Sequence, residues 1–230
     1  MGIVVSIDGE RLDPDGRHVS VFDRGFLFGD GVFETFRTYG GRRCFALDEH
    51  LERLAWSASR IGMLLPVPHD VLATEIDACI AEANNPESFL RVVVTRGRGP
   101  IALDPSVALH PTRVVIVMPL RGIAPELYAN GVGIAVAREV RPIVASPYAG
   151  AKTCNYVPNL LAVRDAIARG AHEALFVTGD DRVTEGASSN VFVVSGRRLA
   201  TSPLSEGILA GITRRHVMDV GRALGLEVVE

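Results

Sequence analysis

The chain has 230 residues, which suits one large domain or two small ones. Hydrophobic residues make up 47% and charged residues 22% of it, as in globular proteins and unlike disordered chains. A net charge of −3 gives no reason to expect a nucleic-acid partner, and no apolar stretch is long enough to cross a membrane.

The cysteines Cys44, Cys79 and Cys154 are odd in number and widely spaced, and the six histidines are dispersed. This pattern argues against a disulfide framework and against a metal site. The first residues lack the basic segment and cleavage site of a secretory signal. We therefore expect a cytoplasmic protein that binds no metal.

Short β-rich segments dominate the first part of the chain. Strands are predicted at 2–8, 31–39 and 43–45, the last two joined by a Gly40-Gly41 turn. β-branched runs at 89–95 and 112–119 predict central strands, joined by a long loop at 97–110.

Helical spacing of apolar residues predicts two helices between these strands. The first follows an N-cap at Asp48, and the second covers about 70–83. The residues expected to face inward are Leu51, Leu54, Ala55, Ala58 and Ile61 in the first helix, and Leu72, Ile76, Cys79 and Ile80 in the second.

The second half of the chain follows a linker predicted at 120–125, which gives domains at 1–119 and 126–230. Strands are predicted at 133–138, 174–177 and 190–194, and helices at 157–169, before a Gly170 stop, and at 212–224. Residues 226–230 read as the opening of a strand, so we expect the natural sequence to continue beyond Glu230.

Lys152 is the only lysine among the 24 lysine and arginine residues. Reversible imine formation is one task that arginine cannot perform, because its guanidinium is never usefully deprotonated. An arginine-favouring bias that left one surface lysine is the alternative. However, Lys152 lies in a loop of small residues, Ala149-Gly150-Ala151, where backbone can approach a flat ligand closely.

Two further segments contain residues suited to a cofactor. Glu185 stands among small and polar residues, where it is either a solvated turn residue or a carboxylate that keeps a heterocyclic nitrogen protonated. The glycine-spaced loop before Thr213 either places Thr213 as a helix cap or forms a phosphate site at a helix N-terminus. Arg53 is predicted to lie off its helix's apolar stripe, paired with Glu49 or with a phosphate.

Taken in order, these segments resemble the class IV, or fold-type IV, pyridoxal-phosphate enzymes: branched-chain aminotransferases, D-amino acid aminotransferases and aminodeoxychorismate lyases. The resemblance runs from Asp23 almost to the end of the chain. Its motifs are Gly29-Asp30-Gly31-Val32-Phe33-Glu34, His50-x-x-Arg53-Leu54, Lys152-x-x-Asn155-Tyr156, Thr184-Glu185-Gly186 with Asn190-Val191-Phe192, and Gly211-Ile212-Thr213.

The resemblance implies an α/β (α+β) fold of two domains, with a small N-terminal domain and a larger, β-barrel-like C-terminal domain whose end is truncated here. It also implies a homodimer in which each active site borrows a loop from the other subunit. Lys152 would form the internal aldimine with pyridoxal 5′-phosphate and move protons at the substrate Cα. The other implied cofactor contacts are Glu185 to the ring nitrogen, Tyr156 to the ring oxygen, Leu209 on one ring face, and Arg53, Ile212 and Thr213 to the phosphate.

Substrate class follows from smaller differences within the family. The carboxylate-trapping arginine and histidine of D-amino acid enzymes would fall near Ile101 and Leu103, which are apolar here. Phe33 and Arg91 look closer to branched-chain enzymes and are the predicted substrate-binding residues. We therefore expect transamination of an aliphatic amino acid with 2-oxoglutarate. Aminodeoxychorismate lyase activity, D-amino acid transamination and cofactor binding without catalysis remain alternatives.

Overall fold

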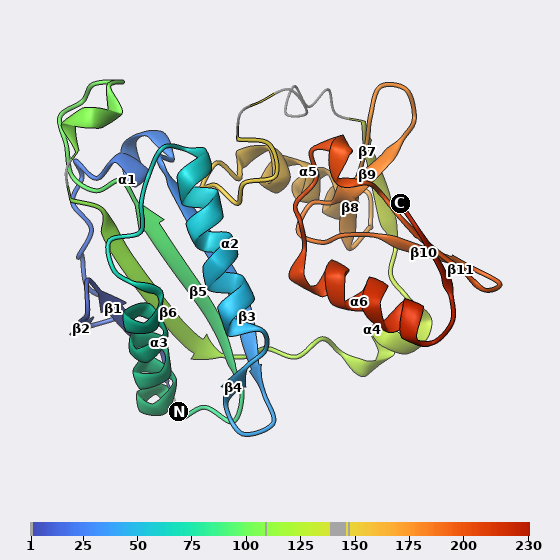
Figure 1. The fold of residues 1–230 in the computed structure, drawn as a ribbon, viewed down its shortest axis with the longest axis horizontal. Coiled ribbons are helices and arrows are strands. Elements are labelled where there is room, and N and C mark those ends of the chain that lie inside the picture. The colour runs from blue at the N-terminus through green and yellow to red at the C-terminus, as the bar shows by residue number, and fades with distance from the viewer. Residues whose placement is uncertain (1, 109, 139–145, 147) are drawn as a thin grey trace. The chain divides into compact units, whose positions relative to one another are not determined.

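The computed structural model of the chain describes residues 2–108, 110–138, 146 and 148–230. Its contacts divide it into two compact units (Figure 1). The first comprises Met1–Gly122 and Ala151–Asn155, and the second comprises Ile123–Gly150 and Tyr156–Glu230. The chain thus returns to the first unit for five residues that include Lys152. Compactness does not test independent folding, so the domain boundaries 1–119 and 126–230 stay a prediction.

The first unit is built on one six-stranded sheet in the order β2-β1-β6-β5-β3-β4. All of its paired strands run antiparallel. The bounds are β1 Val4–Ile7, β2 Glu10–Leu12, β3 Gly31–Tyr39, β4 Arg43–Cys44, β5 Ser88–Thr95 and β6 Thr112–Pro119. The prediction of two central strands at 89–95 and 112–119 is confirmed by β5 and β6.

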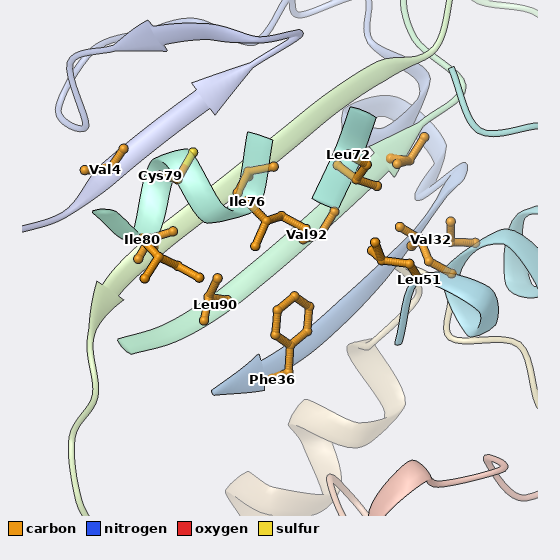
Figure 2. Close-up of a cluster of buried hydrophobic side chains, with 14 of the residues drawn as sticks. Val4, Val32, Phe36, Leu51, Leu72, Ile76, Cys79, Ile80, Leu90 and Val92 are labelled. Atoms are coloured by element: carbon orange, nitrogen blue, oxygen red, sulfur yellow. The ribbon is translucent and has the colours of Figure 1, made fainter. Parts of the chain in front are cut away.

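Two long helices pack on this sheet, α2 (Leu47–Arg60) and α3 (His69–Ala83). Their apolar residues form one buried cluster with alternate residues of β3, β5 and β6, as Figure 2 shows for Leu51, Ile76 and Leu90. Burial of each such side chain contributes about 1.5–3 kcal/mol relative to exposure. The four residues predicted to face inward on α3 are all buried.

The start of α2 differs from the prediction. Its N-cap is Ala46, in the left-handed conformation at φ 52°, and no side chain caps the helix. Asp48 lies instead in the first turn, where its charge interacts favourably with the helix dipole. Ala55 is exposed, so its predicted inward position is wrong. The short helix α1 (Arg24–Phe28), capped by the Asp23 carboxylate, was not predicted.

The second unit contains two three-stranded sheets among the residues described, in the orders β7-β8-β9 and β10-β11-β12. The strand bounds are β7 Ile134–Arg138, β8 Glu173–Val177, β9 Val183–Gly186, β10 Phe192–Ser195, β11 Arg198–Thr201 and β12 Glu227–Val229. The helices are α4 Pro125–Asn130, α5 Val157–Ala168 and α6 Ile212–Ala223. The predicted closing strand is present as β12, which pairs in parallel with β11.

The surroundings of two predicted segments differ in detail. Glu185 lies within strand β9, which pairs with β8, so the alternative of a solvated turn residue is wrong. The strand predicted at 190–194 begins only at Phe192. Across both units, none of the helices that the structure describes is long and apolar enough to cross a membrane.

Candidate active site

Lys152 is held against the sheet of the first unit by its own backbone. The Phe33 N–H donates to the Lys152 carbonyl at 2.9 Å, and the Lys152 N–H donates to Ser57 Oγ on α2 at 3.1 Å. Two residues further on, the Cys154 N–H donates to the Gly31 carbonyl at 2.9 Å. Lys152 is only 9% exposed, so the alternative of a solvated surface lysine is wrong.

The side chain of Lys152 lies beside the ring of Phe33. Its Nζ is 4.6 Å from the ring centroid, and the Arg91 Cζ is 3.9 Å from the same centroid. Phe33 itself is buried, at 2% exposed. Contacts of this kind favour a cation over an aromatic face. The structure therefore brings together the predicted imine-forming lysine and both predicted substrate residues.

Arg53 has a partner that the sequence did not predict, the buried carboxylate of Glu34. Its Nε and Nη2 donate to the two carboxylate oxygens of Glu34, each at 2.7 Å, and Nδ1 of His50 lies 2.8 Å from Glu34 Oε2. The Arg53 side chain is 11% exposed, so the alternative of a solvated arginine is wrong. The phosphate-binding role of Arg53 stays a prediction.

Glu34 is the functional candidate that the sequence reasoning missed. It has no exposed surface, because it lies between the buried Val32 and Phe36 on the same inward face of β3. Burial raises the pKa of Glu34, but hydrogen bonds and charges from Arg53 and His50 outweigh it and lower the pKa below 4.5. The sequence signal that could have revealed Glu34 is its position two residues from each of two apolar strand residues. That spacing predicts a buried carboxylate, and a buried carboxylate needs a cationic partner.

In the second unit, Glu185 is linked to Leu209 and Asn190. The Leu209 N–H donates to Glu185 Oε2 at 3.0 Å, while Asn190 Nδ2 donates to the Leu209 carbonyl at 3.2 Å. Asn190 Nδ2 is also 3.5 Å from the Glu185 carboxylate. The side-chain amide thus ties the strand β9 to the loop before α6. This arrangement places two predicted cofactor contacts, Glu185 and Leu209, side by side.

Helix α6 begins at Ile212 without any side-chain cap, since its N-cap is Gly211. A Cβ at Gly211 would collide with the amide oxygen of Asn190, so this turn requires glycine. Thr213 is the second helical residue, and the alternative in which it caps the helix is therefore wrong. The first N–H groups of a helix have no intrahelical acceptor, which suits them to an anion.

Tyr156 is the N-cap of α5, and its side chain is half-buried. Within the described part of the chain, no group of three or more histidine, cysteine or acidic residues could hold a metal ion.

Each unit, taken by itself, presents groups that suit a phosphorylated aldehyde cofactor. The first unit has a buried primary amine and an oriented guanidinium. The second unit has a carboxylate and an uncapped helix N-terminus.

Comparisons with known proteins find similar aminotransferases. A putative branched-chain-amino-acid aminotransferase of Methanocaldococcus jannaschii is 34% identical over 227 residues, covering 98% of this chain and 77% of that protein. A D-alanine aminotransferase of Bacillus licheniformis is 32% identical over 226 residues, again covering 98% of this chain and 77% of that protein. The crystal structure of a branched-chain aminotransferase from Thermoproteus uzoniensis with norvaline is 30% identical, with a TM-score of 0.88, and the match covers 99% of this chain and 77% of that one.

The model of the amino-transferase class IV family matches residues 31–230, which include the Lys152, Glu185 and Thr213 segments. The chain therefore belongs to the class IV aminotransferases, enzymes that depend on pyridoxal phosphate.

Proposed function

We propose that this enzyme transfers the amino group of a branched-chain or other aliphatic amino acid to 2-oxoglutarate. The observation that carries the proposal is the cluster of Lys152, Phe33 and Arg91. The buried Phe33 ring places apolar atoms next to the only primary side-chain amine of the chain. The guanidinium of Arg91 next to the same ring offers a partner for a substrate carboxylate.

When bound, pyridoxal phosphate supplies an aldehyde and a conjugated ring that withdraws electrons from the amine-bearing carbon of the substrate. In this proposal Lys152 binds the cofactor and moves the proton at the substrate Cα. Glu185 holds a proton on the ring nitrogen, with its carboxylate oriented by the Leu209 N–H. Tyr156 donates to the ring oxygen, and the Leu209 side chain covers one ring face.

The proposed phosphate contacts are Arg53, Ile212 and Thr213. Arg53 provides a guanidinium whose plane is fixed by Glu34. Ile212 and Thr213 provide backbone N–H groups at the start of α6, where the helix dipole favours negative charge.

An absorption spectrum of the purified holoenzyme tests the proposal, recorded before and after adding L-leucine or D-alanine in separate samples. L-leucine should bleach the yellow band towards the pyridoxamine form, and 2-oxoglutarate should then restore it with release of glutamate. Bleaching by D-alanine alone would overturn the proposed substrate class.

Transamination of D-amino acids is the second candidate, favoured by the similarity to the B. licheniformis D-alanine aminotransferase. Against it, Ile101 and Leu103 are 71% and 85% exposed apolar side chains at the positions where a carboxylate trap would lie. Aminodeoxychorismate lyase activity is the third candidate function. Release of pyruvate and p-aminobenzoate without an oxo-acid acceptor would reveal this activity. Cofactor binding without catalysis is not supported, because the family consists of enzymes.

We also propose a homodimer in the cytoplasm. The three cysteines carry free thiols, which supports a reducing compartment. Size-exclusion chromatography with light scattering measures the mass directly, and a single species near the 24.7 kDa chain mass would contradict the dimer.

A further inference from the structure

Two hydrogen bonds to Glu34 fix the plane of the Arg53 guanidinium in the absence of any ligand. Glu34 presents both carboxylate oxygens from the inward face of β3, and Arg53 meets them with Nε and Nη2, each at 2.7 Å. Two parallel charge-assisted hydrogen bonds define an orientation as well as a distance. Because Glu34 has no exposed surface, water does not compete for these bonds.

A second group holds the same carboxylate. His50 lies one turn before Arg53 on α2, and its Nδ1 is 2.8 Å from Glu34 Oε2. The His50 ring in turn packs against the ring of Phe36, with centroids 4.9 Å apart. The carboxylate is therefore fixed by its own strand and by two residues of the facing helix, which leaves Arg53 few alternative rotamers.

We propose that Glu34 is a positioning residue which orients Arg53 for the cofactor phosphate. This inference rests on the proposed phosphate-binding role of Arg53. An arginine that is already oriented loses less rotamer freedom on binding than a mobile one, so the affinity for the phosphorylated cofactor depends on Glu34. Glu34 has no assigned contact with the cofactor and acts only through Arg53.

The same unit offers a matched control in the pair of Glu75 on α3 and Arg113 on β6. Arg113 Nε donates to Glu75 Oε2 at 2.6 Å, and Ser6 Oγ donates to the other carboxylate oxygen. This pair is also buried, with side chains 7% and 8% exposed, and it carries no proposed site residue. Glu75→Gln therefore removes the same kind of interaction as Glu34→Gln without touching Arg53.

The experiment compares cofactor binding with and without the phosphate. The apoenzyme is titrated with pyridoxal phosphate and with pyridoxal, and the ratio of the two Kd values isolates the phosphate contribution. Glu34→Gln should lower the preference for the phosphorylated form by roughly tenfold, while Glu75→Gln should leave it within about twofold of wild type. Urea midpoints of both variants show whether they lose similar stability. A wild-type preference in folded Glu34→Gln would overturn the inference.

A variant of Arg53 separates this inference from the proposed function. If Arg53→Met keeps the wild-type preference, the phosphate assignment of Arg53 is wrong, and the inference fails with it. If Arg53→Met loses the preference and Glu34→Gln keeps it, only the positioning role is wrong. The double variant Glu34→Gln/Arg53→Met should be no weaker than Arg53→Met alone, because Glu34 acts through Arg53.

The variant Glu34→Asp provides a second test in case Glu34→Gln does not fold. It keeps the negative charge but withdraws the carboxylate by one methylene, which breaks the two-bond geometry. We expect a preference between those of wild type and Glu34→Gln. A folded Glu34→Asp with the wild-type preference would contradict the orienting role.

Discussion

Lys152 and Glu185, the two groups with the most demanding proposed chemistry, are held in different ways. Lys152 is fixed by backbone hydrogen bonds to Phe33 and Ser57, residues distant in sequence that belong to the sheet and helix of the first unit. Glu185 is fixed through its side chain, by the Leu209 N–H and the nearby amide of Asn190.

The hydrophobic clusters behind these two residues also differ. That of the first unit contains large side chains, shown in Figure 2 for Leu51, Leu72, Ile80 and Leu90. That of the second unit, among the residues described, has Phe176 and four alanines as its buried members, while Leu199, Ile208, Ile212 and Met218 are buried outside it. Alanine buries little apolar area, so packing contributes less to this cluster than to that of the first unit. We infer that substitutions near Lys152 disturb its position less than substitutions near Glu185 disturb the orientation of the Glu185 carboxylate.

The largest expected effect lies at Lys152 itself. Lys152→Ala should lower turnover by at least about 10³-fold, because it removes the amine that binds the cofactor and moves the proton. Steady-state assays with L-leucine and 2-oxoglutarate measure the loss. The urea midpoint should stay close to that of wild type, and an unchanged rate would rule out the assigned role.

Next in size is the loss at Glu185. Glu185→Ala should lower kcat/KM by about 10²-fold, as expected when one oriented electrostatic partner of the reacting system is removed. Glu185→Asp retains the charge and should lose less than about tenfold. Equal losses in the two variants would argue against a carboxylate role at the ring nitrogen.

A pair of smaller substitutions tests the comparison directly. Ser57→Ala leaves the buried Lys152 N–H without its acceptor and should cost about 1–3 kcal/mol of unfolding free energy with little change in kcat. Asn190→Ala loosens the link between β9 and the Leu209 loop and should lower kcat several-fold at a smaller cost in stability. Urea unfolding and initial rates measure both variants. A large loss of kcat in Ser57→Ala, together with an unchanged kcat in Asn190→Ala, would contradict the inferred difference between Lys152 and Glu185.

The smallest effect concerns acid stability. The pKa of Glu34 lies below its ordinary value of 4.5, so its contribution to stability is present above pH 4.5 and is lost as pH falls through the folded-state pKa. Below pH 4.5, wild type should lose unfolding free energy more steeply than Glu34→Gln, by at most about 1.4 kcal/mol per pH unit. Urea unfolding at pH 3 to 6 measures the unfolding free energy of both proteins. The same pH dependence in wild type and Glu34→Gln would contradict the lowered pKa.

Much of the first unit could be predicted because its signals are local. Ile76 and Cys79 recur at helical spacing, and the β-branched runs of β5 and β6 are typical of central strands. The start of α2 could not be predicted, because Ala46 adopts the left-handed conformation without the residue type that usually signals it. Helix α1 spans only five residues, too few for periodicity to reveal.

The candidate site was partly predictable for a similar reason. Lys152 stands out by composition alone, and Gly211 and Thr213 by the glycine-spaced segment that opens a predicted helix. The partners were not predictable, since the pairs Glu34–Arg53 and Glu185–Leu209 join residues on different elements. Only the tertiary structure determines which buried carboxylate meets which donor.

The return of Ala151–Asn155 to the first unit has a consequence for how the protein can be divided. A gene fragment that ends at Gly122 would encode the whole six-stranded sheet but neither Lys152 nor Thr153, which bridges to Val32 on β3. A fragment that starts at Ile123 would carry the lysine without the strand that holds it. The two units are therefore not interchangeable modules, and recombination at the linker would have to exchange these five residues together with the sheet.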